Sequence, residues 1–257
     1  IAERYGFRYI ETPKLEETNL FKRSVGESSD IVGKEMYQFV DKGENDVCLR
    51  PEGTAGVVRA FIENKLDRIE TINRFFYHGS MFRYERPQKG RLREFHQFGC
   101  EVFGESSVYE DANLIIMLSQ MFKAVGIGFN IELNTLGCQT CVPSYRETLV
   151  TFLTAKKEHL CGDCHRRIET NPIRALDCKV DSCQAQFTDA PFITDNVCEV
   201  CNSEFKQLQK LLQNADIEFS INKKLVRGLD YYSKTAFEFT SNAIGSQSAI
   251  AGGGRYD

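Results

Sequence analysis

The segment between residues 74 and 104 constrains the fold of this chain more than any other. It holds two aromatic-rich runs, RFFYHGSMFR (74–83) and REFHQFGCEVFG (93–104), which have the composition of β-strands. The stretch between them, YERPQKGRL (84–92), contains Pro and Gly and predicts a loop. The sequence therefore predicts a long β-hairpin.

The second strand of this hairpin has two unlike faces, because side chains alternate along a strand. One face is mostly apolar and is expected to pack on a core layer: Glu94, His96, Phe98, Cys100 and Val102. The other face suits a polar ligand, because it carries a cation, an amide and a carboxylate: Arg93, Phe95, Gln97, Gly99, Glu101 and Phe103. The glycine at position 99 is expected to leave room for something other than a side chain.

The hairpin loop and its edges are basic, although the chain carries a net charge of -4. The cations are Arg83, Arg86, Lys89, Arg91 and Arg93. The guanidinium fork donates two parallel hydrogen bonds and suits phosphate, and an aromatic ring on the same strand can stack on a base. We therefore expect a nucleoside triphosphate to bind here beside a small polar molecule. The alternative is a solvated basic loop over an exposed strand.

The rest of the chain predicts a mixture of helices and strands. Apolar residues at helical spacing predict helices over 53–66 and 109–127, and FNIELNTLG (129–137) predicts a strand and a turn. AIAGGGRYD (249–257) predicts a Gly-rich turn that leads into a strand. No apolar run is long enough to span a bilayer, and ten cysteines without a secretion signal favour a reducing, cytoplasmic location.

Eight of the ten cysteines lie between Cys138 and Cys201. Four pairs have ligand-like spacing: Cys138–Cys141, Cys161–Cys164, Cys178–Cys183 and Cys198–Cys201. Such pairs bind tetrahedral zinc, and a four-thiolate site would be structural. A set of reduced structural thiols is the alternative. Cys161 and Cys164 are the best candidates for half of a site, and the spacing leaves the other half open.

The hairpin sequence resembles motif 2 of the class II aminoacyl-tRNA synthetases, in the form of the histidyl-tRNA synthetase family. Four more stretches are similar to that family. GFRYIETPKLE resembles the end of motif 1, and LRPEGTA (49–55) resembles the amino-acid-binding loop of the family. LVRGLDYYSKTAFEF (225–239) resembles its first histidine motif, and AGGGRYD (251–257) resembles the start of its second. Several separated motifs in the right order make the resemblance specific.

The resemblance implies roles in ATP binding for residues around the hairpin. Arg83 would bind the α-phosphate and the histidine carboxylate, and Arg91 would reach the outer phosphates. Glu85 would face the adenine, and Phe95 would stack on it. Arg227 would act on the α-phosphate from the side opposite Arg83, where related enzymes use a metal ion. ATP would enter with Mg²⁺.

The resemblance also implies a histidine site. Glu52 and Thr54 would hold the α-amino group, and Gln97 would contact the backbone end of the substrate. Glu101 and Tyr232 would read the imidazole, with Tyr256 beside them. Each role has a structural alternative. Glu52 and Thr54 could cap a helix near Gly53, Arg227 could be a surface residue at a strand edge, Tyr232 could be core and GGGRYD could be a plain turn.

The family implies an α+β fold, in which an antiparallel class II sheet is flanked by helices and carries a mostly helical, Cys-rich insertion. The expected organisation is a catalytic core over 1–137 and 223–257, interrupted by an insertion domain over 138–222. Motif 3 and the anticodon-binding domain would follow residue 257, and most of the motif 1 helix would precede Ile1. We therefore expect this stretch alone to charge tRNA poorly or not at all.

The resemblance implies a histidine–tRNA ligase that acts as a homodimer on histidine, ATP and tRNA(His). One alternative is a non-catalytic paralogue that serves as a regulatory or sensor subunit. Such paralogues tend to lose the arginines and the substrate loop, which are present here, so the enzyme is favoured. A zinc-ribbon binding module is a second alternative, but it would explain only the middle of the chain.

Overall fold

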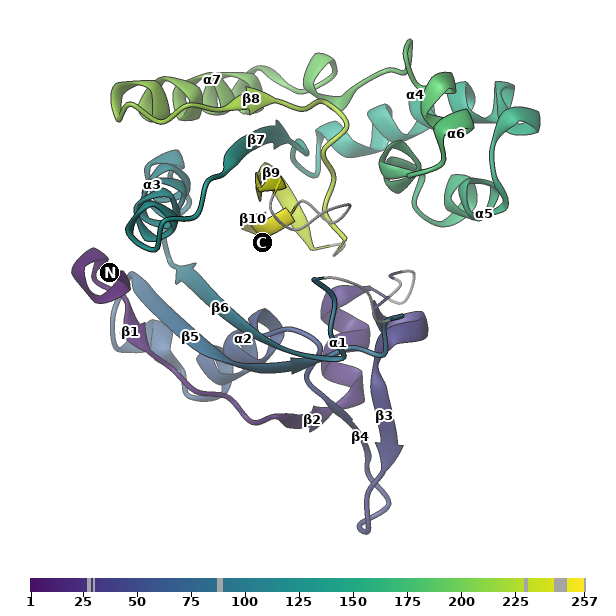
Figure 1. Ribbon diagram of the computed structural model, residues 1–257. Helices are drawn as coiled ribbons and strands as arrows, with labels where there is room; N and C mark the ends of the chain where they lie inside the picture. The colour runs from purple at the N-terminus through teal and green to yellow at the C-terminus, as the bar shows by residue number, and fades with distance from the viewer. Residues whose placement is uncertain (27–28, 30, 87–89, 229–230, 243–248, 257) are drawn as a thin grey trace. The chain divides into compact units, whose positions relative to one another are not determined.

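The computed structural model describes residues 1–257 except 27–28, 30, 87–89, 229–230, 243–248 and 257 (Figure 1). Lys89 of the predicted basic loop therefore lies outside the described residues. The described residues form two compact units, one of residues 1–126 and the other of residues 127–242 and 249–256. Among the described helices, none combines the length and the apolar character needed to cross a membrane.

The predicted hairpin is the centre of the first unit. Strands β5 (Asn73–Phe82) and β6 (Glu94–Phe103) pair antiparallel along their whole length, and β1 (Arg8–Tyr9) adds a short parallel strand beside β5 (Figure 1). Both long strands begin and end within a residue of the predicted bounds. Their aromatic-rich composition, with Pro and Gly in the loop between them, explains why they could be predicted so closely.

Two helices cover the two faces of this sheet. Helix α2 (Thr54–Glu63) packs Val57 against Phe75 and Tyr77 on one face. Helix α3 (Val108–Ala124) packs Met117 against the face that carries Phe98. The apolar face of β6 thus packs on a core layer, as predicted, and both helices lie where the helical spacing placed them.

A second small sheet completes the first unit. Its strands are β2 (Leu15–Glu17), β4 (Asp46–Leu49) and β3 (Tyr37–Val40), in that order and all antiparallel. Helix α1 (Thr18–Val25) directly follows β2. The last residues of β4 lead into the LRPEGTA loop, which connects β4 to α2.

The second unit is built on a four-stranded sheet with the order β10-β9-β7-β8. Strands β7 (Asn130–Thr135), β9 (Tyr232–Thr240) and β10 (Ala249–Tyr256) are antiparallel neighbours, and β8 (Ser220–Ile221) runs parallel to β7. The strand pattern that begins near residue 129 is therefore confirmed.

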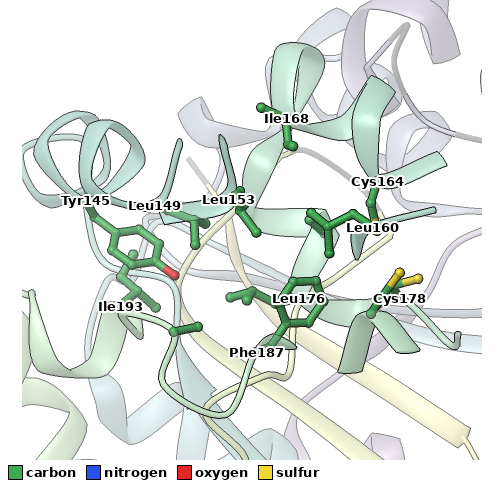
Figure 2. Packing of buried hydrophobic residues seen from close by; sticks show 13 residues of the cluster. Tyr145, Leu149, Leu153, Leu160, Cys164, Ile168, Leu176, Cys178, Phe187 and Ile193 are labelled. Atoms are coloured by element: carbon green, nitrogen blue, oxygen red, sulfur yellow. The ribbon is translucent and has the colours of Figure 1, made fainter. Parts of the chain in front are cut away.

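The described residues outside this sheet include four α-helices: α4 (Cys141–Ala155), α5 (Gly162–Thr170), α6 (Asp181–Gln186) and α7 (Glu199–Asn214). The first three share an apolar core in which Tyr145, Leu149 and Leu153 of α4 face Leu176 and Phe187 (Figure 2). The Cys-rich segment is thus mostly helical. With antiparallel sheets flanked by helices, the predicted α+β fold class is confirmed.

Short helical turns occupy several connections. They are the 3-10 turns Ala2–Tyr5, Leu66–Arg68, Lys157–His159, Pro172–Asp177 and Ile193–Asp195, and a π turn over Ile31–Glu35.

Candidate active site

The loop between β4 and α2 places a buried carboxylate at the start of the helix. The Glu52 side chain is 3% exposed, and its two oxygens accept the backbone N–H groups of Thr54 at 2.7 Å and Ala55 at 2.9 Å. Burial raises the pKa of the Glu52 carboxyl, and these N–H groups oppose that shift. Glu52 therefore caps α2, as the structural alternative proposed.

Thr54 does not share this capping role through its side chain. Its hydroxyl donates to Glu101 Oε1 at 2.8 Å, and Tyr77 Oη donates to the same oxygen at 3.2 Å. Glu101 is 6% exposed. The carboxylate expected to read the imidazole is thus buried and held in one orientation by two hydroxyl groups from α2 and β5.

Tyr77 is a residue that sequence reasoning missed. It lies opposite Gly99 in the β5–β6 register, and a Cβ atom at Gly99 or at Gly53 would lie 2.2 Å from its ring. Burial raises the pKa of the Tyr77 hydroxyl, and the carboxylates of Glu101 and Glu52 raise it further. The expectation that Gly99 leaves room for something other than a side chain is wrong, because the Tyr77 ring fills that space.

Tyr77→Phe is expected to lower the free energy of unfolding by about 1 kcal/mol, because one donor to a buried carboxylate is lost. Urea unfolding of the intact protein, together with hydrogen exchange of the β5 and β6 amides, measures the change. Tyr84→Phe is the matched control, since this hairpin tyrosine is 55% exposed. Equal effects of the two substitutions would contradict the role of the Tyr77 hydroxyl.

Arg83 is anchored at the mouth of the hairpin. Its Nε donates to the backbone oxygen of Pro51 at 2.9 Å, and its guanidinium carbon lies 5.2 Å from the centre of the Phe95 ring. The side chain remains 22% exposed. The structure thus places Arg83 beside Phe95, the predicted stacking residue, and beside the loop that carries Glu52.

Glu85 and Arg91 lie on the two sides of the hairpin loop and pair with each other. Arg91 Nη1 is 2.9 Å from Glu85 Oε2, and the side chains are 38% and 12% exposed. Glu85, which is expected to face the adenine, and Arg91, which is expected to bind the outer phosphates, therefore neutralise each other's charge. Binding of a triphosphate by Arg91 would therefore compete with this ion pair.

Gln97 lies on the polar face of β6, between Phe95 and Gly99. Its Oε1 atom is buried and accepts no hydrogen bond from the described residues. Buried acceptors are nearly always paired in folded proteins, so this oxygen is suited to a donor that arrives with a ligand. An ammonium group is a donor of that kind.

Arg50 is a second residue that sequence reasoning missed. It is 5% exposed, and it donates to the backbone oxygens of Ser80 at 3.0 Å and Thr12 at 2.8 Å. It thereby ties β5 to the segment before β2. A lone arginine beside Pro51 gave no signal that distinguished this structural role from ligand binding.

In the second unit, Arg227 is held against strand β9. Its Nη1 donates to Glu238 Oε2 at 2.9 Å, and its guanidinium carbon lies 5.5 Å from the centre of the Tyr232 ring. Burial raises the pKa of Glu238, and the charge of Arg227 opposes that shift. The Arg227 side chain is 17% exposed, so the alternative of a surface residue at a strand edge is wrong.

The glycines near the C-terminal end are part of a strand. Gly252, Gly253 and Gly254 pair with Glu238, Phe237 and Ala236 of β9, so the predicted turn over these residues is wrong. A Cβ atom at Gly252 would lie 2.4 Å from Arg227 Nη1, and one at Gly253 would lie 2.7 Å from the Phe237 ring. Because these glycines have no side chain, the Arg227 guanidinium and the Phe237 ring can occupy the space beside them.

Tyr232 and Tyr256 are paired across β9 and β10. Sequence reasoning missed Tyr231, whose ring centre lies 4.6 Å from that of Tyr232 and 5.5 Å from that of Tyr256. Tyr232 is half-buried, which differs from the full burial that the core alternative implies. The three rings form one aromatic cluster beside Arg227.

The predicted site residues thus form two sets. The first unit brings together Glu52, Thr54, Arg83, Glu85, Arg91, Phe95, Gln97 and Glu101 around one hairpin and one loop. The second unit brings together Arg227, Tyr232 and Tyr256.

Comparison with known proteins decides the family. The sequence profile of the histidyl-tRNA synthetases matches residues 1–257. The chain belongs to the histidyl-tRNA synthetase family. Histidine–tRNA ligases from Sulfurimonas denitrificans and Sulfurovum sp. are 68% and 67% identical over the whole chain, which spans 64% of the length of each.

Solved structures of histidyl-tRNA synthetases share the fold. The apo enzyme from S. aureus is 33% identical and superposes with a TM-score of 0.77, over 99% of this chain and 59% of that one. A Bacillus halodurans protein described as an ATP phosphoribosyltransferase regulatory subunit/histidyl-tRNA synthetase is 21% identical, with a TM-score of 0.66 over 100% of this chain and 69% of its own. At that identity the likeness concerns the fold alone.

Proposed function

We propose that this chain is part of a histidine–tRNA ligase. The enzyme activates histidine with ATP, which gives histidyl-adenylate and pyrophosphate, and then transfers histidine to the 3' end of tRNA(His). The observation that carries the proposal is the polar face of β6, where Phe95, Gln97 and Glu101 follow one another beside the anchored Arg83.

The first step joins two anions, and this explains the need for fixed positive charge. The histidine carboxylate attacks the α-phosphorus, a new O–P bond forms, and the bond to pyrophosphate breaks. No general base is required, because a carboxyl group with a pKa of about 3.5 is already ionised. Catalysis then rests on positioning and on preorganised cations, the roles proposed for Arg83 and Arg227.

The remaining residues bind the two substrates. ATP enters as its magnesium complex, with Phe95 stacked on the adenine, Glu85 facing it and Arg91 on the outer phosphates. Glu52, Thr54 and Gln97 receive the backbone end of histidine, and the unpaired Oε1 atom of Gln97 supports this role. Tyr232 and Tyr256 line the imidazole site.

Selectivity for histidine would come from Glu101. An imidazole N–H donates to a carboxylate, and the two hydroxyl groups that fix Glu101 orient it for such a donor. An amino acid without this N–H would leave the buried carboxylate without its ligand partner. Such a mismatch costs far more than a poor steric fit.

We further propose the domain organisation that the motifs imply. Residues 1–137 and 223–257 belong to the catalytic core, and residues 138–222 form an insertion. The intact protein would act as a homodimer in the cytoplasm, with tRNA(His) as its macromolecular substrate.

ATP–pyrophosphate exchange by the intact protein tests the proposal, with each amino acid supplied in turn. We expect exchange with histidine alone, and charging of tRNA(His) in the second step. Exchange with another amino acid would overturn the substrate assignment. Binding of histidine without any exchange would instead favour the non-catalytic regulatory or sensor paralogue.

A further inference from the structure

Eight of the ten cysteines converge into two groups of four, all within the second unit. The outer group consists of Cys138, Cys141, Cys198 and Cys201, and the inner group consists of Cys161, Cys164, Cys178 and Cys183. Within each group all four sulfur atoms lie within 4.8 Å of one another. The structure therefore selects Cys178 and Cys183 as the partners of Cys161 and Cys164.

The sulfur separations match the edges of a metal-centred tetrahedron. A Zn–S bond of about 2.3 Å places tetrahedral ligands about 3.8 Å apart. In the outer group, Cys138 Sγ lies 3.5 Å from Cys141 Sγ and 4.0 Å from Cys198 Sγ, and Cys141 Sγ lies 3.9 Å from Cys201 Sγ. In the inner group, the Cys161 and Cys178 sulfurs are 3.8 Å apart.

These separations argue against the other states of clustered cysteines. A disulfide bond requires about 2.05 Å between sulfurs, and all ten cysteines are unbonded. The ligand sulfurs of a four-iron cluster surround a cube of iron and sulfide, so they lie further apart than in either group. A single tetrahedral ion is the occupant that the spacing fits.

The two groups repeat the same backbone arrangement. In the outer group, the N–H of Cys198 donates to Cys141 Sγ at 3.1 Å, and in the inner group the N–H of Cys161 donates to Cys183 Sγ at 3.2 Å. In both cases the first cysteine of one pair donates to the second cysteine of the other. An N–H aimed at sulfur stabilises a thiolate, which is the form that binds a metal.

Helix starts add to this stabilisation. Cys141 is the first residue of α4, and Cys161 and Cys198 directly precede α5 and α7. Negative charge is favoured at the start of a helix, because the N–H groups there have no partner within the helix. Three helices therefore begin where the sulfur atoms gather.

Apolar packing accounts for only part of the arrangement. Cys164 and Cys178 lie at one end of the helical core, away from Tyr145 and Ile193, and they are buried as small apolar side chains often are (Figure 2). Cys138 and Cys198, however, are only half-buried. Burial in a core gives no reason for half-exposed cysteines to converge on a second pair about sixty residues away.

We propose that each group binds one zinc ion through its four thiolates. Four protein ligands leave no open position, so both ions are structural. The outer ion joins the turn after β7 to the start of α7, and so holds together two parts of the chain about sixty residues apart. The inner ion joins the start of α5 to Cys178 and α6. Neither role depends on the proposed reaction.

Metal analysis of the intact protein, purified without a chelator or a metal-affinity tag, tests the proposal. We expect two zinc ions per chain, one for each group. Cys141→Ser in the outer group and Cys183→Ser in the inner group should each lower the content by one ion. Cys48→Ser and Cys100→Ser are matched controls, since these cysteines lie outside both groups, and they should keep both ions.

A second measurement on the unaltered sequence covers variants that fail to fold. Cobalt(II) exchanged into the protein should give the intense visible bands and the sulfur-to-cobalt charge-transfer band of a tetrahedral four-thiolate site, at two equivalents per chain. Folded protein that contains no zinc, that contains iron in its place, or that binds cobalt without these bands would overturn the proposal.

Discussion

Arg227→Ala in the intact protein is expected to lower kcat/KM for histidine in ATP–pyrophosphate exchange by about 10²–10³-fold, the usual cost of removing one preorganised group that stabilises transition-state charge. The guanidinium is already fixed by Glu238 and lies against Tyr232, so little reorganisation is needed when charge builds on the α-phosphate. Exchange assays at saturating ATP measure the loss.

Two comparisons separate this role from a general loss of structure. Arg146→Ala removes an exposed arginine of α4 in the same unit and should leave exchange unchanged. Arg227→Lys keeps the charge but not the planar fork, so it should recover only part of the rate. A folded Arg227→Ala protein that exchanges at nearly the original rate would refute the proposed role.

Gly104→Ala is expected to cost roughly 3 kcal/mol or more of unfolding free energy, because a left-handed backbone conformation and a steric clash add together. Gly104 directly follows β6 and has a φ of 87°, and a Cβ atom there would lie 1.8 Å from the backbone oxygen of Thr71. A backbone atom cannot move aside as a flexible side chain can. Urea unfolding and hydrogen exchange of the β5 and β6 amides measure the loss.

Gly126→Ala is the matched control for this prediction. Gly126 has a φ of 72°, but a Cβ atom there would meet nothing within 4 Å. It therefore isolates the conformational cost of about 1–2 kcal/mol for a residue other than glycine in the left-handed region. Equal losses for the two substitutions would show that the contact with Thr71 has no effect on stability.

The hairpin and its covering helices could be predicted closely from the sequence. The two long strands are rich in aromatic residues and are separated by a loop that contains Pro and Gly, and α2 and α3 repeat apolar residues at helical spacing. The glycines of β10 could not be placed in this way, because glycine carries no side-chain pattern and is uncommon within strands. Pairing with β9 and the space taken by Arg227 determine that segment.

The site residues could be named from the order of the motifs, but their contacts could not. Nothing in LRPEGTA indicates that the Thr54 hydroxyl turns toward a carboxylate forty-seven residues away, while the Glu52 carboxylate caps the helix. The role of Tyr77 could not be predicted, because it depends on the pairing register that places Tyr77 opposite Gly99. The cysteine pairs were visible, but spacing alone does not decide which pairs converge across the fold.

The packing of one ring against two glycines also limits how this sequence can evolve. Gly53 and Gly99 lie far apart in the chain, and yet the Tyr77 ring excludes a side chain at both. Neither glycine can be replaced by a larger residue while Tyr77 remains, and a smaller residue at position 77 would leave a void beside both glycines. The three positions are therefore epistatic, and an accepted change at one of them would require a compensating change at another.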